Sequence, residues 1–247
     1  MGAALRPFKT PQGTAFSGFP EEGLRFLKAL KRNNRREWFQ PRKETYEASL
    51  KAPMLELVHA INQDLVKIAP DYVTDPKKAT FRIYRDTRFS HDKTPYKTHI
   101  AAVFGKRGMA GHSGGMLYFH LSPEGVEVAG GVYHPEPEAM RQVRFHLAEN
   151  HEELKRILGA RKLRAAMGEL KGDELTRAPK GFPPGHPAAD WIRKKDWILD
   201  VTLDVEVAKT ADLIEELTSR FRLMLPFVEF FNRAPRPATV YRQSDRL

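Results

Sequence analysis

The sequence predicts a single α+β domain, in which a mostly antiparallel sheet packs against N-terminal and C-terminal helices. Apolar residues recur at helical spacing up to about residue 65, alternate with polar residues between 81 and 132, and return to helical spacing afterwards. No interior linker separates two composition regimes. We therefore expect one domain over roughly residues 16–233, a flexible arm at 1–15 and a tail at 234–247.

The N-terminal part is expected to be helical. Pro20 followed by Glu21 and Glu22 is typical of a helix start, because proline is tolerated there and carboxylates offset the helix dipole. A second helical stretch begins at Pro41. Pro53 inside that stretch predicts a kink or two abutting helices, because proline has no N–H to give to a helix interior.

Strands are expected in the middle of the chain, where alternation replaces the helical period. The candidate segments are 81–84, 99–104, 116–121 and 126–132. The last two flank Ser122-Pro123-Glu124-Gly125, whose proline in second place and glycine in fourth place suit a type I turn. The sequence therefore predicts a β-hairpin over residues 115–132.

The C-terminal third is expected to return to helices. The stretch Ala178 to Pro187 contains four prolines and two glycines and is predicted to be a loop. Trp191 to Leu199 is predicted to be a short helix end followed by an edge strand. A long amphipathic helix is expected from Leu213 to Val228, with a bend at Pro226.

Composition narrows the class of protein. The 247 residues include 41 basic and 31 acidic side chains, a net charge of +10, so a polyanionic partner such as nucleic acid is considered. The chain contains no cysteine, which excludes disulfides, thiolate catalysis and cysteine-ligated zinc. The sequence contains no apolar run of about 18 residues, which is the length that a membrane-spanning helix needs. We expect a cytoplasmic protein with no membrane partner.

One pattern resembles a functional motif but lacks the structural context that the motif requires. Gly111-His112-Ser113-Gly114-Gly115 matches the nucleophile-elbow pattern, but an elbow follows a strand and precedes a helix, whereas here a predicted strand comes next. No dinucleotide fingerprint or Walker loop is present, and the nine histidines show no tight ligand spacing. We therefore expect neither a cofactor nor a metal site.

The segment 77–107 is the most informative part of the sequence. It contains nine basic residues and two acidic ones, so seven of the ten excess positive charges lie in it. Arginine and lysine side chains are the usual ligands of phosphate and carboxylate groups. The predicted ligand-binding residues are Arg82, Arg85, Arg88, Lys93, Tyr96 and Lys97. The alternative is a solvated face whose arginines pair with carboxylates such as Asp86 and Asp92.

Alternation along the predicted strands assigns side chains to faces. If Phe81, Ile83, Phe119 and Val128 face the core, polar side chains share the opposite face of the sheet. That set consists of Arg82, Tyr84, Tyr118, His120 and Glu127. A histidine and a carboxylate beside a bound anion are suited to acid–base chemistry, so His120, Tyr84 and Glu127 are catalytic candidates. A plain solvent-facing sheet would give the same pattern.

The string Phe81-Arg82-Ile83-Tyr84-Arg85-Asp86, followed by Arg88-Phe89-Ser90 and Lys93-Thr94-Pro95-Tyr96-Lys97-Thr98, resembles the domain of unknown function 2461 family. Further motifs resemble it in the same order, namely 16–19, 33–39, the Gly114-Gly115 hairpin, 180–182 and His186-Pro187. The resemblance covers about residues 16–232 and implies one domain. It implies no activity and no catalytic residues.

The sequence therefore leaves three hypotheses for the function of the protein. The first is an enzyme or binding protein for a small phosphate- or carboxylate-bearing ligand. The others are a nucleic-acid-binding protein, which is less favoured because no recognised motif appears, and an interaction module without a ligand. Oligomeric state is not indicated. The loop Phe89 to Thr98, stiffened by Pro95, is predicted to fold back over the sheet and bring Lys93 or Lys97 near Arg82–Arg85, with an anion or carboxylates between.

Overall fold

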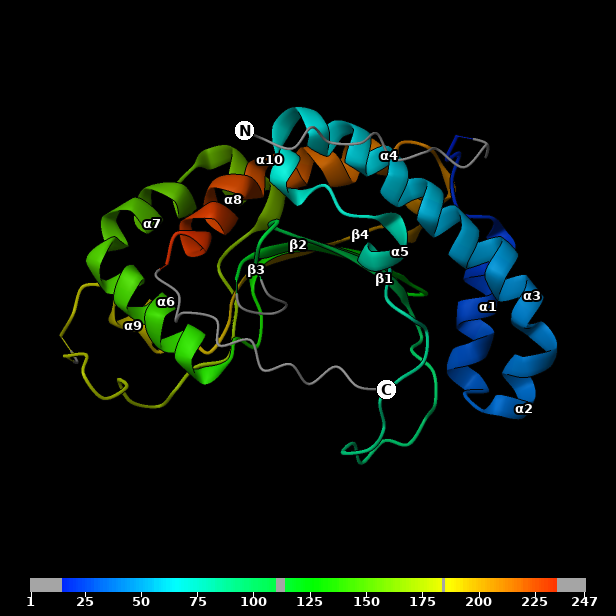
Figure 1. Ribbon diagram of the computed structural model, residues 1–247, viewed down its shortest axis with the longest axis horizontal. Coiled ribbons are helices and arrows are strands. Elements are labelled where there is room, and N and C mark those ends of the chain that lie inside the picture. The colour runs from blue at the N-terminus through cyan, green and yellow to red at the C-terminus, as the bar shows by residue number, and fades with distance from the viewer. Residues whose placement is uncertain (1–14, 110–113, 184, 235–247) are drawn as a thin grey trace.

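The computed structural model describes residues 15–109, 114–183 and 185–234, and it forms one mixed α+β domain (Figure 1). The sheet has four strands, β1 (Ile100–Gly105), β2 (Met116–Ser122), β3 (Gly125–Val132) and β4 (Trp197–Leu203). They lie in the order β1-β2-β3-β4, and every neighbouring pair is antiparallel. The predicted fold class is confirmed, and β4 is an edge strand as expected.

The predicted hairpin is present as β2 and β3. Ser122 pairs with Gly125, so Pro123 and Glu124 occupy the turn, and Ser122 Oγ accepts a hydrogen bond from the Glu124 N–H. The apolar set alternates as the sequence indicates. Leu117, Phe119, Leu121, Val126, Val128 and Val132 are all fully buried.

Helices surround the sheet on one side and at both ends (Figure 1). The N-terminal group consists of α1 (Glu21–Arg32), α2 (Arg36–Phe39), α3 (Lys43–Tyr46), α4 (Ala52–Ile68) and α5 (Pro76–Ala79). The C-terminal group consists of α6 (Pro137–Glu149), α7 (His151–Leu158), α8 (Arg161–Met167), α9 (Ala189–Ile192) and α10 (Leu213–Asn232). Short 3₁₀ turns lie at 40–42, 70–72 and 205–209. The helices α4 and α10 run side by side over one face of the sheet.

The irregularity predicted at Pro53 is a π-helical turn, Glu47–Lys51, immediately before α4. Pro53 is the second residue of α4 and has no N–H for the carbonyl of Ser49, so the regular hydrogen-bond ladder is interrupted at this point. Helix α1 packs against the freed carbonyl through Gly23, where a Cβ would lie 2.5 Å from Ser49 O. The sequence thus produces two abutting helical segments.

Helix α10 is held close to the sheet. Phe221 makes an edge contact with Phe104 of β1, at 5.7 Å between ring centroids. Near the helix end, a Cβ on Gly115 would lie 2.8 Å from Val228 O, and the Asn232 side chain bonds both the N–H and the carbonyl of Gly115. Gly115, immediately before β2, has no Cβ and therefore permits the close approach of α10 to the sheet.

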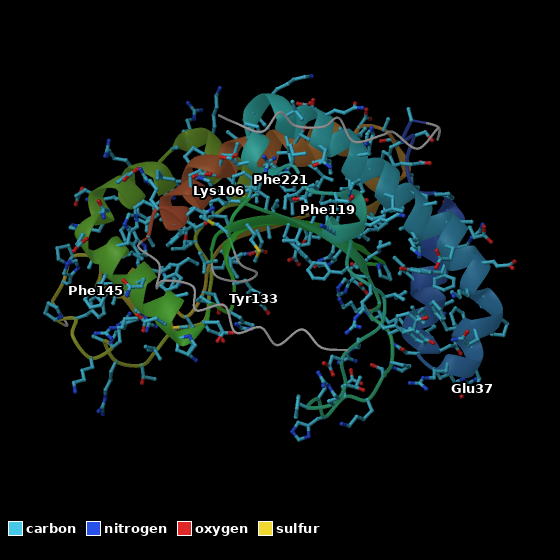
Figure 2. All side chains as sticks on the ribbon, in the orientation of Figure 1. Glu37, Lys106, Phe119, Tyr133, Phe145 and Phe221 are labelled. Atoms are coloured by element: carbon cyan, nitrogen blue, oxygen red, sulfur yellow. The ribbon has the colours of Figure 1, made fainter. Side chains whose placement is uncertain are left out.

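The opposite face of the sheet carries the polar residues. Figure 1 shows no described helix lying across it, and Figure 2 shows Phe221 on the helix-covered side and Tyr133 on the other. Tyr118, His120 and Glu127 on this face are partly buried. We call it the uncovered face.

The expected strand at 81–84 is not a regular strand. The segment is extended, but it is joined to its neighbours by the isolated bridges Thr80–Ala102 and Tyr84–Tyr96. Pro95 lacks an N–H and can only accept, from the N–H of Arg85, so no continuous ladder forms there. Residues 85–95, which we call the basic arm, extend away from the edge of the sheet in Figure 1 instead of folding over it.

Candidate functional site

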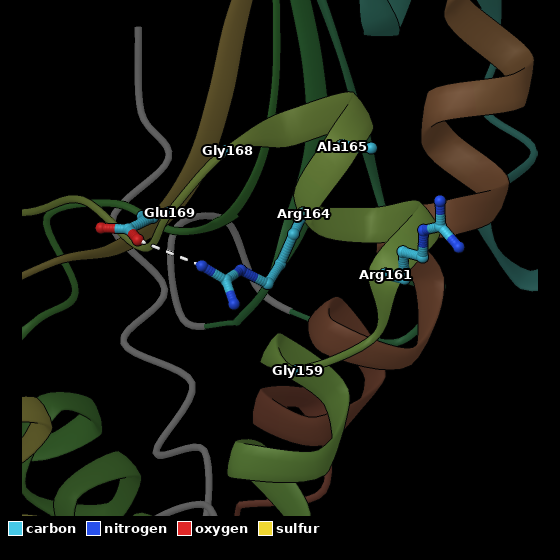
Figure 3. Close-up of a pocket in the computed structure, with 6 residues that line it drawn as sticks. All are labelled: Gly159, Arg161, Arg164, Ala165, Gly168 and Glu169. Carbon is cyan, nitrogen blue, oxygen red and sulfur yellow. Dashed lines mark hydrogen bonds and ion pairs between the residues drawn. The ribbon is translucent and has the colours of Figure 1, made fainter.

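One hollow of about 400 Å³ lies beside α8, and its residues do not form a convincing site (Figure 3). Arg164 donates to Glu169 at 3.4 Å, and Arg161 points away from that pair. The remaining lining residues are Gly159, Ala165 and Gly168, which offer no side-chain polar group. The residues predicted from the sequence lie elsewhere.

Within the basic arm, two predicted ligand-binding arginines are paired with carboxylates. Arg85 donates to Asp92 and to the hydroxyl of Thr94, and Arg88 bonds both oxygens of Asp86. Hydrogen bonds from Arg88 hold the pKa of Asp86 at about 2. Hydrogen bonds from Thr94 and Arg85 do the same for Asp92, whose pKa is about 2. Both carboxylates remain charged at neutral pH, so these arginines are occupied in stabilising the arm.

Two further predicted residues also make internal contacts. The ammonium of Lys93 donates to Thr87 O at 2.9 Å. Tyr96 is buried and stacks on Phe39 with 4.1 Å between ring centroids, and burial raises the pKa of its hydroxyl. The side chain of Asn34 bonds both the N–H and the carbonyl of Tyr96, which fixes the base of the arm against α2.

Lys97 and Arg82 differ from these four residues, because their side chains make no hydrogen bond and no ion pair with a described residue, whereas each of the four makes at least one hydrogen bond. The ammonium of Lys97 lies 4.6 Å from the centroid of the Phe81 ring. Burial and the nearby charge of Arg82 lower the pKa of Lys97. Lys97 is partly buried and Arg82 is exposed, and an anion bound between them would relieve the repulsion that the two cations exert on each other.

Three side chains on the uncovered face form an acid–base cluster. His120 and Glu127 are direct cross-strand partners, with His120 Nδ1 4.0 Å from Glu127 Oε2. The hydroxyl of Tyr118 lies 3.2 Å from the same ring nitrogen. Burial lowers the pKa of His120, and the charge of Glu127 opposes that shift. A neutral imidazole held between a carboxylate and a phenol is able to accept a proton from a ligand.

The cluster continues toward Lys97. The expectation that Phe81 faces the core with Ile83 is wrong, because Phe81 makes an edge contact with Tyr118 of the uncovered face, at 6.3 Å between ring centroids. Lys97 sits over the Phe81 ring. Lys97, Phe81, Tyr118 and His120 therefore form an unbroken series of contacts. Tyr84 lies outside it, packed against Phe39 and Tyr96 and 44% exposed. The structure thus separates Tyr84 from the other two catalytic candidates.

Sequence reasoning missed His99, the residue immediately before β1. Its ring lies 4.8 Å from the ring of His120. Burial, followed by the charges of His120 and Lys97, lowers the pKa of His99 to about 4. The proximity follows from the pairing of Ala101 with His120, and neither strand alone contains a signal for that register.

A second missed pair is His134 and Asp196. The N–H of His134 donates to Asp196 Oδ1 at 2.6 Å, and His134 Nδ1 lies 3.1 Å from the same oxygen. Asp196 is buried, and His134 adopts a φ of 45° to reach it. No sequence signal links residues 62 positions apart. This pair lies at the far end of β3 from Glu127.

In the described part of the chain, no group of three or more histidine, aspartate and glutamate side chains is arranged to hold a metal ion. Nor does that part contain a helix both long and apolar enough to cross a bilayer. Most of the glycine-rich motif at 111–115, namely residues 111–113, lies outside the described residues, as do residues 1–14 and 235–247.

Comparison with known proteins gives one match. The family model described as a conserved hypothetical protein (DUF2461) matches residues 22–230. No curated protein and no solved structure matches the chain significantly. The match confirms the resemblance seen in the sequence motifs, and its description assigns no activity.

Proposed function

The chain belongs to the DUF2461 family, and from the geometry of its uncovered face we propose that it binds and acts on a small phosphate- or carboxylate-bearing ligand. The single observation that carries this proposal is the unpaired, partly buried ammonium of Lys97, placed next to the Tyr118–His120–Glu127 cluster. Binding and proton transfer would then take place on one surface.

The role of each residue follows from its chemistry. Lys97 attracts the anion, and the charge of Arg82 strengthens the local positive potential. His120 is the proton acceptor, because its lowered pKa keeps the ring neutral at pH 7. Glu127 then stabilises the imidazolium that forms, and Tyr118 fixes the orientation of the ring. The paired arginines of the basic arm support the edge of the site without touching the ligand.

Thermal shift with orthophosphate, pyrophosphate, citrate and a panel of phosphorylated sugars tests the binding step. A ligand present at about a hundred times its dissociation constant should stabilise the protein by roughly 2.7 kcal/mol. Lys97→Met should abolish the shift. Lys155→Met, which removes an exposed lysine of α7, is the matched control and should retain it. A shift that survives Lys97→Met unchanged would refute the proposal.

Nucleic-acid binding is the second candidate, because one aromatic side chain of the basic arm is nearly free. Phe89 is 94% exposed, with the guanidinium of Arg88 5.7 Å from its ring centroid. Exposed aromatic and basic side chains are suited to stacking on the bases of a single strand. Binding of oligothymidine at low salt, lost in Phe89→Ala and weakened steeply by added salt, would support it. No binding at low salt would eliminate it.

We also propose a cytoplasmic location. The absence of cysteine is compatible with a reducing compartment, and the basic composition suits a chain surrounded by anionic metabolites. Fractionation of cells that express the full-length chain tests this point, and recovery in a secreted or membrane fraction would contradict it.

A further inference from the structure

We infer that a groove between α2–α4 and the segment 80–84 binds a small molecule that joins an aromatic ring to an anionic group. The groove has a volume of about 520 Å³, which lies within the range of small-molecule sites. Its lining residues come from α2, α3, the π-helical turn, α4, α5 and the segment 80–84. This inference does not depend on the acid–base cluster, and most of its residues were not singled out by the sequence.

The charge of the lining favours an anion. Lys43, Lys51, Lys77 and Arg82 line the groove together with one carboxylate, Glu47. That carboxylate is paired with Lys51 at 2.6 Å. The other three cations form no ion pair with any carboxylate in the described ranges. They come from α3, α5 and the extended segment, so the tertiary fold brings together charges that are far apart in the sequence.

Two hydroxyl groups in the lining add an independent observation. Tyr46 as a whole is 5% exposed, while its hydroxyl keeps contact with solvent and makes no hydrogen bond with a described residue. Burial, together with the charges of Glu47 and Tyr84, raises the pKa of Tyr46, so the group keeps its proton. Thr80 Oγ1 is fully buried without a partner. A buried hydroxyl group is normally satisfied, and an anionic oxygen in the groove would accept hydrogen bonds from Thr80 and from the Tyr46 hydroxyl.

The aromatic side chains of the lining define the other part of the ligand. Phe39 and Tyr46 are buried and lie 5.6 Å apart between centroids, and Tyr84 stands at the edge with its ring 6.4 Å from Phe39. Leu55 completes the apolar portion. A planar ring can pack against these side chains while its charged group meets the lysines and Arg82.

Phe81 lies between the groove and the acid–base cluster. It lines the groove, and it also contacts Tyr118 on the uncovered face. The two sites are therefore neighbours that share Phe81 and Arg82, and their other polar residues are different. Substitutions of Lys43, Lys77 and Tyr46 test the groove alone, whereas Lys97 and His120 test the proposed function alone.

Isothermal titration calorimetry with phenyl phosphate, inorganic phosphate and benzyl alcohol tests the inference on the full chain. Phenyl phosphate should bind at least about tenfold more tightly than either of the other probes, because only it satisfies both parts of the groove. Adenosine monophosphate forms a fourth arm. If adenosine monophosphate binds more tightly than phenyl phosphate, the ligand is a nucleotide. If it binds more weakly, the ligand is a smaller aryl anion.

Three variants locate the binding. Lys43→Met/Lys77→Met should weaken phenyl phosphate binding by about tenfold or more, and Tyr46→Phe, which keeps the ring and removes the hydroxyl, by several-fold. Lys67→Met on the exposed side of α4 is the control and should bind as the unmodified protein does. If the double variant binds phenyl phosphate with unchanged affinity, or if inorganic phosphate binds equally well, the inference is wrong.

Discussion

The imidazole of His120 lies directly across from the carboxylate of Glu127 on adjacent strands, with 4.0 Å between Nδ1 and Oε2. Direct cross-strand neighbours interact more strongly than any other pair on a sheet face. The two residues are joined by a hairpin with a short turn, so their relative position is fixed by local structure.

The first prediction concerns the protonation of His120. Burial lowers its pKa, and the negative charge of Glu127 raises it in opposition. Glu127→Gln should therefore lower the pKa of His120 further, because the opposing charge is removed. NMR titration of the His120 ring measures the shift, with Glu215→Gln on the exposed side of α10 as control. An increase in the pKa would show that the pair does not interact as described.

The second prediction concerns acid stability through His99. Its pKa is about 4 in the folded state, against 6.5 for an ordinary histidine, so the unfolded chain binds the proton more readily. The contribution of His99 to the free energy of unfolding is fully present above pH 6.5 and is lost as the pH falls toward 4. The loss is at most about 3 kcal/mol, because solvent screens the partly exposed ring.

Urea unfolding at pH 7.5 and 4.5 measures this loss. In His99→Gln the stability difference between the two pH values should shrink, because the variant has no imidazole to protonate. His91→Gln removes an exposed imidazole from the basic arm and serves as the matched control. Equal pH dependence in the original chain and in His99→Gln would contradict the assignment.

The third prediction concerns the order of the basic arm. Asp92 accepts hydrogen bonds from Arg85 and from the Thr94 N–H and hydroxyl. Asp92→Asn removes the charge that holds Arg85, so trypsin should cleave at Arg88 and Lys93 faster. Global stability should change by less than about 1 kcal/mol, because the ion pair is exposed. Asp64→Asn on α4 is the control, and an unchanged cleavage rate in Asp92→Asn would mean that other contacts order the arm.

The fourth prediction concerns the contact between α10 and the sheet. Gly115→Ala places a methyl group 2.8 Å from the carbonyl oxygen of Val228, so the helix must shift, at a cost of about 1–3 kcal/mol. Gly105→Ala in β1 meets only Met116 Cγ at 3.9 Å and should be close to neutral. Thermal denaturation compares the two variants. Similar melting temperatures would show that the helix has room at Gly115.

The sequence predicted those parts of the fold that depend on neighbouring residues. The hairpin follows from alternation on both sides of a turn whose proline and glycine have restricted or unusual backbone preferences. Pro53 likewise marks the break before α4, because the missing N–H acts on the same turn of the chain. The faces of β2 and β3 were also predictable, since successive side chains on a strand point in opposite directions.

The candidate site was only partly predictable. His120 and Glu127 were placed on one face because both belong to the hairpin. The sequence contained no signal for His99 beside His120, because the register of β1 against β2 is set by packing and not by either strand alone. Nor could the charge of the segment 77–107 show which cations are free. The pairs Arg85–Asp92 and Arg88–Asp86 depend on side-chain geometry.

The sequence by itself therefore determined the family, the α+β class, the central hairpin and the concentration of basic residues. Tertiary structure alone decided that Lys97 lies over Phe81, that Tyr84 is separated from His120, and that Lys43, Tyr46 and Lys77 meet Arg82 in one groove. The physical reason is the distance along the chain over which each kind of interaction acts. Backbone preferences and alternation act over a few residues, whereas a site is assembled from side chains whose positions are fixed only when the whole core packs.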